Sequence, residues 1–272
     1  MEQGLSITFS SASDRGLKRE DNQDSCGKFP QDDSSLQTPR GQLFVVADGM
    51  GGHAGGRHAS QLAVQALGEA YFAATPEDIR QCLQQAVAVA NQRIYEASTT
   101  SYEFYGMGTT CTALVLQGEA AHIAHVGDSR AYRITSDTIE QLTQDHSKVA
   151  EMQRLGIITE EEARRHPEKS HLYRALGIYT DLEADIITGL AIKPGDHFLL
   201  CTDGLAKVGA QELKKIILSH SPAKACKRLI AIANARGGDD NATVQIVRVR
   251  QSSMPKRSLF SSLARRWRRS ER

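Results

Sequence analysis

Residues 42–52 read QLFVVADGMGG, an apolar, β-rich run that ends at Asp48 and passes directly into glycines. Residues 197–204, HFLLCTDG, have the same form and place Asp203 after the run. A β-strand holds its terminal side chains more rigidly than a loop does, so carboxylates at several strand ends can converge on one point. Converging carboxylates predict a site for a hard cation.

Further aspartates flank other apolar runs: Asp239 and Asp240 precede ATVQIVRV, and Asp128 follows AAHIAHVG. A single aspartate before Gly or Asn usually caps a turn. Buried carboxylates gathered from several such places would repel one another and lose stability unless a cation compensated them. Oxygen ligands without a histidine–cysteine cluster favour magnesium or manganese over zinc or copper. The glycines after Asp48 also let the Gly49 carbonyl approach such an ion.

The composition is that of an ordinary globular protein. The 272 residues are 40% hydrophobic and 24% charged, which is enough for one core and a single domain. The sequence contains no run of about 18 apolar residues and no N-terminal signal sequence, which predicts a cytoplasmic protein. We expect a monomer. Five scattered cysteines, an odd number, predict reduced thiols and not a zinc site.

The charge is distributed unevenly. Seven basic residues against one acidic residue give residues 251–272 a net charge of +6, so residues 1–250 carry −5. An acidic body argues against a nucleic-acid-binding protein. The basic tail is expected to be either a flexible, solvated segment or an amphipathic helix that contacts an anionic membrane or an acidic partner. The apolar residues of such a helix, at near-helical spacing, are Leu259, Phe260, Leu263 and Trp267.

Helices are predicted where apolar residues recur at helical spacing. Residues 49–60 are too glycine-rich for regular structure, and a first helix is expected to follow them. Thr75, Pro76 and Asp78 form the pattern of an N-cap, a first-turn proline and a capping box for a second helix that ends near Ala97. Other helices are expected at 61–73, 210–219 and 222–235.

Strands are predicted in groups. Residues 108–135 contain three β-rich runs joined by turn residues, which predict an antiparallel meander. Residues 143–177 are polar and predict a helical insertion, with a capping box at Thr159 and Glu162 and a break at Pro167. Strands grouped with strands and helices with helices predict an α+β fold built in layers. Further strands are expected near 184–192, 197–202 and 242–249.

Eight segments follow one another in an order that resembles a known family. They are RGLKREDNQD (15–24), VVADGMGGHAGG (45–56), GTTCTALVL (108–116), AHVGDSRAYRI (124–134), LTQDHS (142–147), HLYRALG (171–177), FLLCTDGL (198–205) and GGDDNATV (237–244). Together they resemble the bacterial branch of the 2C-type (PPM) metal-dependent serine/threonine protein phosphatases. The resemblance implies a four-layer αββα sandwich of two antiparallel sheets flanked by helices. It also implies a phosphatase domain over residues 1–250 and a flap at about 147–170 beside the active site.

The resemblance implies roles for the aspartates. Asp48 corresponds to the ligand that bridges two metal ions, and the Gly49 carbonyl to a ligand of one of them. Asp203 and Asp240 correspond to ligands of the other ion; the D-N-x-T pattern selects Asp240 over Asp239. The implied ions are Mn²⁺ or Mg²⁺, and two such ions about 3.5–4 Å apart lower the pKa of a shared water that attacks phosphorus.

The resemblance gives three more residues a function. Asp128 corresponds to the ligand of a third, weaker metal site. Arg19 corresponds to the arginine that clamps the substrate phosphate, where a planar guanidinium holds two oxygens and lysine would substitute poorly. Asp24, with Gln23 beside it, corresponds to a residue that orients metal-bound water.

The proton for the leaving alkoxide has two candidate sources. Met50 stands where eukaryotic relatives have a histidine. His53 is a candidate general acid, although a loop histidine can also be structural, and water on a metal is the alternative donor.

The implied function is metal-dependent hydrolysis of phosphoserine and phosphothreonine in proteins, reversing a cytosolic serine/threonine kinase. Three alternatives stay open: a signalling adaptor without catalysis, a binding module recruited through the basic tail, and a phosphatase of small phosphate esters. Loss of a metal ligand would favour the adaptor, and none is lost.

Overall fold

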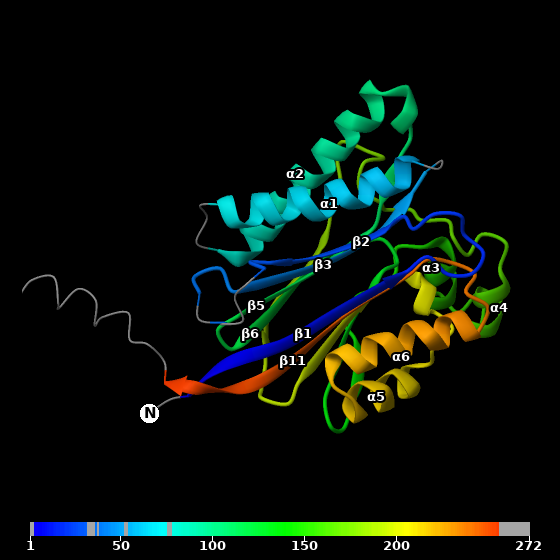
Figure 1. Ribbon diagram of the computed structural model, residues 1–272. Coiled ribbons are helices and arrows are strands. Elements are labelled where there is room, and N and C mark those ends of the chain that lie inside the picture. The colour runs from blue at the N-terminus through cyan, green and yellow to red at the C-terminus, as the bar shows by residue number, and fades with distance from the viewer. Residues whose placement is uncertain (1–2, 32–35, 37, 52–53, 75–77, 256–272) are drawn as a thin grey trace, which may run out of the picture.

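The computed structural model describes residues 3–31, 36, 38–51, 54–74 and 78–255. These residues form two antiparallel β-sheets that lie face to face between two pairs of helices (Figure 1). Among them, no helix combines the length and the apolar content that crossing a bilayer requires. All five cysteines are free thiols.

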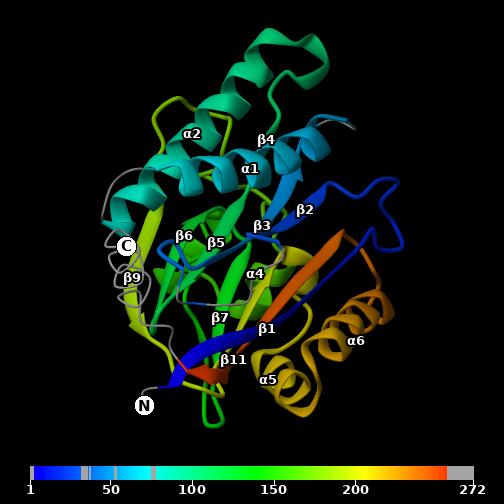
Figure 2. The same ribbon diagram turned by 60° about the vertical axis from the view of Figure 1, so that its left-hand side comes forward.

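The first sheet has the strand order β1-β11-β10-β7-β8 and is antiparallel throughout. In Figures 1 and 2, β1 runs alongside β11, so the first and last described strands are neighbours. The strands of this sheet are β1 (Gln3–Asp14), β7 (Arg130–Ile134), β8 (Ile139–Gln141), β10 (His197–Cys201) and β11 (Ala242–Pro255).

The second sheet has the order β2-β3-β5-β6-β9, with the short strand β4 paired to β3. Side chains that point between the two sheets, such as Phe44, Leu114 and Phe198, form a buried inner core. The strands of this sheet are β2 (Asp24–Phe29), β3 (Gln42–Met50), β4 (Gly108–Thr109), β5 (Cys111–Gln117), β6 (Ala120–Val126) and β9 (Asp185–Ala191).

Helix pairs cover the outer face of each sheet (Figure 2). Helices α1 (Ala54–Ala73) and α2 (Ile79–Thr100) pack on the second sheet through a buried apolar cluster. Helices α5 (Ala210–Ser219) and α6 (Pro222–Ala235) pack on the first sheet through another. The order helix, sheet, sheet, helix confirms the predicted four-layer αββα sandwich, and the bounds of α5 and α6 agree with the prediction.

The predicted start of the first helix was wrong. Helix α1 begins at Ala54 and includes Gly55 and Gly56, which were expected to be irregular. A Cβ on Gly56 would lie 2.6 Å from Gln23 Oε1. The glycines therefore allow this helix to approach the end of β3, and the close approach stabilises a helical turn that local propensity disfavours.

Helix α2 begins later and ends later than expected. Its N-cap is Asp78, whose carboxylate accepts a hydrogen bond from Arg80 N. Thr75 and Pro76, the predicted cap and first-turn proline, lie outside the described residues. The helix continues to Thr100, past the expected end near Ala97.

The predicted meander was wrong in its third strand. Strands β5 and β6 do form an antiparallel pair, but β7 pairs with β10 and β8 in the other sheet. The chain crosses between sheets at Gly127–Ser129, where Gly127 has a φ of 106°. Turn residues alone do not distinguish a hairpin from such a crossing.

Three edge strands, β1, β2 and β8, were not predicted. Strand β11 is also longer than expected and takes in residues 251–255, which were assigned to the basic tail. These residues pair with β1, with Leu5 opposite Gln251. The tail from residue 256 onward lies outside the described residues.

The polar insertion is helical, as predicted, and contains two short helices, α3 (Lys148–Arg154) and α4 (Glu160–Arg165). The predicted capping box is confirmed: Thr159 Oγ1 accepts from Glu162 N, and Glu162 accepts from Thr159 N. Two one-turn 3₁₀ helices complete the fold, η1 (Tyr102–Phe104) and η2 (Asp203–Leu205).

Candidate active site

Strand ends from both sheets bring the predicted aspartates to one end of the sandwich. Asp48 lies near the end of β3, and Asp24 stands directly opposite it at the start of β2. Asp203 follows β10 and begins η2, while Asp240 precedes β11. Asp128 joins them because its turn is the crossing between β6 and β7. The sheet crossing that the sequence did not reveal is thus what places Asp128 beside the others.

Mutual repulsion and removal from water raise the pKa values of these carboxyls. Burial raises the pKa of Asp24 to about 7, and nearby Asp203 and Asp240 add to the effect. Burial raises the pKa of Asp203 to about 6, with the charge of Asp240 contributing. Asp48 and Asp128 also have a pKa well above the ordinary value, first through desolvation and then through neighbouring aspartates. The group is therefore strongly destabilised when fully ionised without a cation.

The donors fit hard divalent cations in type and charge. Within the described part of the chain, Asp24 Oδ1 and Asp203 Oδ1 are buried oxygens without a hydrogen-bond partner, which is costly unless something binds them. Among the described residues, no three Asp, Glu, His or Cys side chains lie close enough together to hold a metal ion as they stand. Carboxylates that repel one another would have to close in when an ion neutralises them.

Asp24 and Asp48 are held by the backbone and by hydroxyl groups. Thr202 Oγ1 donates to Asp24 Oδ2 at 2.8 Å and accepts from Thr243 N at 2.9 Å. Asp48 N donates to Thr110 Oγ1 at 2.9 Å. Thr202 follows β10 and Thr110 precedes β5, and the sequence predictions included neither of them. The only signal was for Thr202, which stands beside Asp203 in CTDG; Thr110, in GTTC, has no aspartate next to it in sequence.

Asp239 and Asp240 are adjacent in sequence but have different surroundings. Asp239 is exposed and pairs with Lys18 at 2.5 Å and with Lys207. Hydrogen bonds from these two lysines lower the pKa of Asp239 to about 2. Asp240 instead turns toward the other carboxylates and accepts from Arg19 Nη2 at 2.6 Å. The structure therefore groups Asp240, and not Asp239, with the strand-end aspartates.

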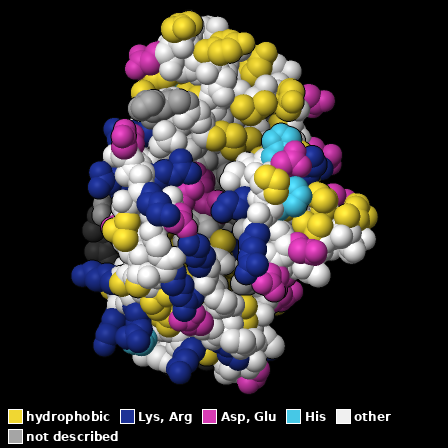
Figure 3. Space-filling view, turned by 90° about the vertical axis from the view of Figure 1, so that its right-hand side faces the viewer, with side chains coloured by type: hydrophobic (Ala, Val, Ile, Leu, Met, Phe, Trp, Pro, Cys, Tyr) yellow, Lys and Arg dark blue, Asp and Glu magenta, His cyan; other side chains and the backbone are white. Residues whose placement is uncertain are grey.

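A cleft of about 400 Å³ begins at these carboxylates and extends beneath α3 and α4. Figure 3 looks onto this face and shows acidic side chains in a hollow bordered by Lys and Arg side chains. The cleft is lined by Asp128, Arg130, Asp145, Ser147, Val149, Ala150, Gln153, Glu160, Ala163, Lys169, Ser170, Asp203, Gly204, Ala206, Lys207, Ala233, Gly238, Asp239 and Asp240.

Comparison with known proteins assigns this arrangement to a family. Residues 18–245 match the family described as Protein phosphatase 2C. The chain belongs to the protein phosphatase 2C family.

Relatives of this phosphatase support the same assignment. The serine/threonine phosphatase stp of Listeria innocua is 38% identical over 240 residues, which cover 86% of this chain and 92% of the relative. The crystal structure of the Mycobacterium tuberculosis serine/threonine phosphatase PstP/Ppp matches with a TM-score of 0.78 and 33% identity, covering 90% of this chain and all of that one. A PstP catalytic domain in complex with two manganese ions matches with a TM-score of 0.79 and 33% identity, covering 91% and 100% of the two chains.

The predicted enzyme class, a metal-dependent protein serine/threonine phosphatase, is confirmed by these matches. The individual residue roles stay predictions. Met50 ends β3 and pairs with Gly108 of β4. His53, the candidate general acid, lies outside the described residues.

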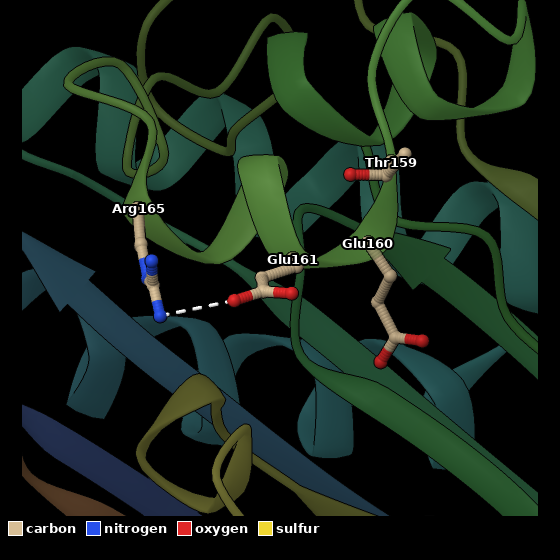
Figure 4. Close-up of a pocket in the computed structure, with 4 residues that line it drawn as sticks. All are labelled: Thr159, Glu160, Glu161 and Arg165. Atoms are coloured by element: carbon tan, nitrogen blue, oxygen red, sulfur yellow. Dashed lines mark ion pairs between the residues drawn. The ribbon is translucent and has the colours of Figure 1, made fainter.

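Two features of the phosphatase lay beyond the sequence predictions. Arg130 donates to both carboxylate oxygens of Asp145, at 3.0 Å from Nε and 2.6 Å from Nη2, and so joins the start of β7 to the segment before α3. A second hollow, of about 430 Å³, lies on α4. Figure 4 shows its lining, where Glu161 and Arg165 form an ion pair at 3.0 Å and Thr159 and Glu160 complete the wall. None of the strand-end aspartates lines that hollow.

Proposed function

We propose that this phosphatase hydrolyses phosphoserine and phosphothreonine in proteins with two divalent ions, Mn²⁺ or Mg²⁺. Asp48, the Gly49 carbonyl, Asp203 and Asp240 would hold these ions, and Asp128 would hold a third, weaker one. The observation that carries the proposal is the convergence of these carboxylates with Asp24. Asp24 Oδ1 and Asp203 Oδ1 are buried without a hydrogen-bond partner, and Asp128, Asp203 and Asp240 line one cleft. Bound ions would supply an activated water and neutralise the phosphate charge.

The residues around the carboxylates would fix their orientation. Thr202 and the β2–β3 pairing hold Asp24 opposite Asp48. Asp24 would accept a hydrogen bond from the attacking water and orient it toward phosphorus. Because Thr202 is itself fixed by Thr243 N, Asp24 keeps one position while the substrate changes.

Arg19 would bind the substrate phosphate at the rim of the cleft. Its side chain is 54% exposed and pairs with Asp240. An exposed ion pair of this kind contributes little to stability. Arg19 can therefore leave Asp240 and bind a phosphate dianion with little loss in the free energy of unfolding. A guanidinium also gains a second parallel hydrogen bond when it moves to phosphate.

The segment 147–170 would form the flap that receives the protein part of the substrate. It supplies one wall of the cleft, including Val149, Ala150 and Ala163, while the turn after Asp203 supplies the other. A cleft that leads away from the carboxylates suits a peptide chain better than a small ester, since a small ester would use only its mouth. The phosphatase domain would comprise residues 1–250 together with the rest of β11.

Neighbouring aspartates provide the experiment that tests this proposal. We expect Asp240→Asn to lower Mn²⁺-dependent hydrolysis of a phosphothreonine peptide by about 100-fold or more, whereas Asp239→Asn, the matched control, changes it less than threefold. Asp48→Asn should abolish the activity without loss of fold, measured by circular dichroism. Full activity of Asp48→Asn, or of the wild-type protein in excess chelator, would contradict the two-ion proposal.

The uneven charge of the sequence supports the proposal for the tail, because residues 251–272 carry a net charge of +6. The basic tail would contact an anionic membrane or an acidic partner, and the enzyme would oppose a serine/threonine kinase in the cytoplasm. Sedimentation with anionic lipid vesicles, using the full chain and a chain ending at residue 255, tests the membrane contact. Equal partitioning of the two proteins would exclude it.

A further inference from the structure

The turn that carries Asp128 is held by a histidine from outside it. His146 lies just before the flap, and its backbone N–H donates to the Gly127 carbonyl at 2.7 Å. In return, the Gly127 N–H donates to His146 Nδ1 at 3.1 Å. Both residues are buried, where two opposed hydrogen bonds are strong and expensive to lose. They fix the residue next to Asp128.

The far side of the imidazole is also held. His146 Nε2 lies 3.1 Å from Asp185 Oδ2, and Asp185 Oδ1 accepts from Arg174 Nη1 at 2.9 Å. Because Nδ1 accepts from Gly127, the ring proton is on Nε2 and donates to Asp185. The side chain is 2% exposed and packs between the rings of His125 and Tyr173, with centroids 4.8 Å and 5.6 Å away. The ring therefore has one orientation.

The opposite side of the turn is attached to the end of β3. A Cβ on Gly127 would lie 2.6 Å from the Thr110 side chain, so the turn sits directly against Thr110. Thr110 Oγ1 and Ser129 Oγ are 2.7 Å apart, and the same Thr110 oxygen accepts from Asp48 N. The turn is thus connected to Asp48 on one side and to His146 on the other.

We propose that His146 is a positioning residue, which holds the turn Gly127–Ser129 so that the Asp128 carboxylate stays beside Asp48 and Asp203. It acts through the backbone of Gly127 and touches no substrate. The proposal rests on the proposed role of Asp128 as a metal ligand. It also makes His146 the junction through which the flap is attached to the active site, because Ser147 caps α3 directly after it.

Two substitutions separate the two contacts of the ring. The amide oxygen of His146→Asn is attached at the same place as Nδ1 and can still accept from Gly127 N. The amide of His146→Gln extends to the position of Nε2 and reaches Asp185 but leaves Gly127 N unpaired. If His146 acts through Gly127, Mn²⁺ affinity and kcat should fall in His146→Gln and be retained in His146→Asn.

The readouts are Mn²⁺ binding by titration calorimetry without substrate, and kcat and KM for p-nitrophenyl phosphate. For His146→Gln we expect Mn²⁺ affinity and kcat each to fall by about tenfold or more, the range seen when a residue that orients a ligand is changed, with KM within twofold of wild type. For His146→Asn we expect both within threefold of wild type.

His122→Asn is the matched control. His122, in β6, is likewise buried, and its Nδ1 accepts from a backbone N–H, that of Gly189 at 3.3 Å, but Gly189 is not next to any of the strand-end aspartates. The His122→Asn variant should have an Mn²⁺ affinity and a kcat within twofold of the wild-type values. Equal losses in the glutamine and asparagine variants, or wild-type values in the glutamine variant, would overturn the proposal.

Two further variants complete the test. If His146→Gln does not fold, Asp185→Ala tests the same ring from its other side and should reduce Mn²⁺ affinity severalfold, and an unchanged affinity would then refute the role of His146. Asp128→Asn tests the underlying function. Unchanged Mn²⁺ binding in Asp128→Asn would refute Asp128 as a ligand, whereas weakened binding there with normal binding in His146→Gln would refute only the positioning role.

Discussion

The strand-end site and the flap are stabilised in different ways. At the strand ends, Asp48 and Asp24 are fixed by buried hydroxyl and backbone groups such as Thr110 and Thr202. The segment proposed as the flap contains two short helices, and its side chains form exposed ion pairs, for example Lys148 of α3 with Glu168, which follows α4, at 2.6 Å. Chemistry needs ligands fixed to a fraction of an ångström, whereas a surface that receives different proteins benefits from adaptable contacts. In this fold the side chains that need a fixed position are buried, and those that need adaptable contacts are exposed.

The largest difference between the strand-end site and the flap is expected when a proposed metal-ligating side chain is replaced. Asp203→Asn should lower kcat for a phosphothreonine peptide on the order of 10³-fold, because several kcal/mol of charge stabilisation by the ions would be lost. Glu161→Gln, on the exposed face of α4, should change kcat less than twofold. Steady-state kinetics at saturating Mn²⁺ measure both, and comparable losses would mean that the flap takes part in the chemistry.

A pH effect should arise beneath the flap. Burial, followed by the neighbouring His146, lowers the pKa of His125 to about 4. The unfolded chain binds the proton near its ordinary pKa of about 6.5, so it holds more protons than the folded protein between the two values. Stability should therefore fall as pH falls from about 6.5 to 4, by on the order of 3 kcal/mol.

Urea unfolding of the metal-free protein at several pH values measures this effect. His125→Gln should remove that part of the pH dependence whatever it does to the stability at pH 7. An identical slope in the variant and the wild type would show that other groups cause the acid sensitivity.

A smaller loss is expected from one hydroxyl group of the strand-end site. Thr202→Val keeps the shape of the side chain but leaves Asp24 Oδ2 and Thr243 N without their partner, which should reduce the free energy of unfolding by about 1–3 kcal/mol. Thr138→Val, in an exposed turn, should change it by less than about 0.5 kcal/mol. Urea denaturation at pH 7 compares them, and similar values for the two would contradict a buried hydrogen-bonded role for Thr202.

The smallest effect is expected in the flap. Replacing Lys148 and Glu168 singly and together by alanine should leave the urea midpoint unchanged, because exposed ion pairs are screened by water and salt. A double-mutant cycle that gives a coupling comparable to the loss in Thr202→Val would show that the flap is as firmly held as the strand ends.

Much of the fold followed from local sequence signals. Helix α6 starts with Pro222 and ends before Gly237, and such residues set boundaries through their own backbone preferences. The crossing of β7 into the other sheet did not follow, because the turn at Gly127 has the composition of a hairpin. Helix α1 began early because Gly56 packs against Gln23, a contact between distant segments.

The site was predictable where a carboxylate ends an apolar run. Asp48 and Asp203 have that signature. Asp239 and Asp240 differ in the structure through partners that are distant in sequence: Lys18 and Lys207 pair with Asp239, and Arg19 pairs with Asp240. His146 lies in the segment LTQDHS, but that segment does not indicate its role, which depends on a backbone group that only the tertiary structure brings to it. Sequence patterns therefore locate the proposed ligands of this phosphatase better than the residues that support them.

The pairing of β1 with β11 has a consequence for synthesis. Arg19, in the loop after β1, meets Asp240, which is 221 residues later in the chain. Among the described strands, β1 has β11 as its neighbour in its own sheet, so during translation it waits for β11 to leave the ribosome. Contacts of such long sequence separation form late. A nascent chain in which β11 has not yet been made therefore lacks part of the proposed catalytic centre.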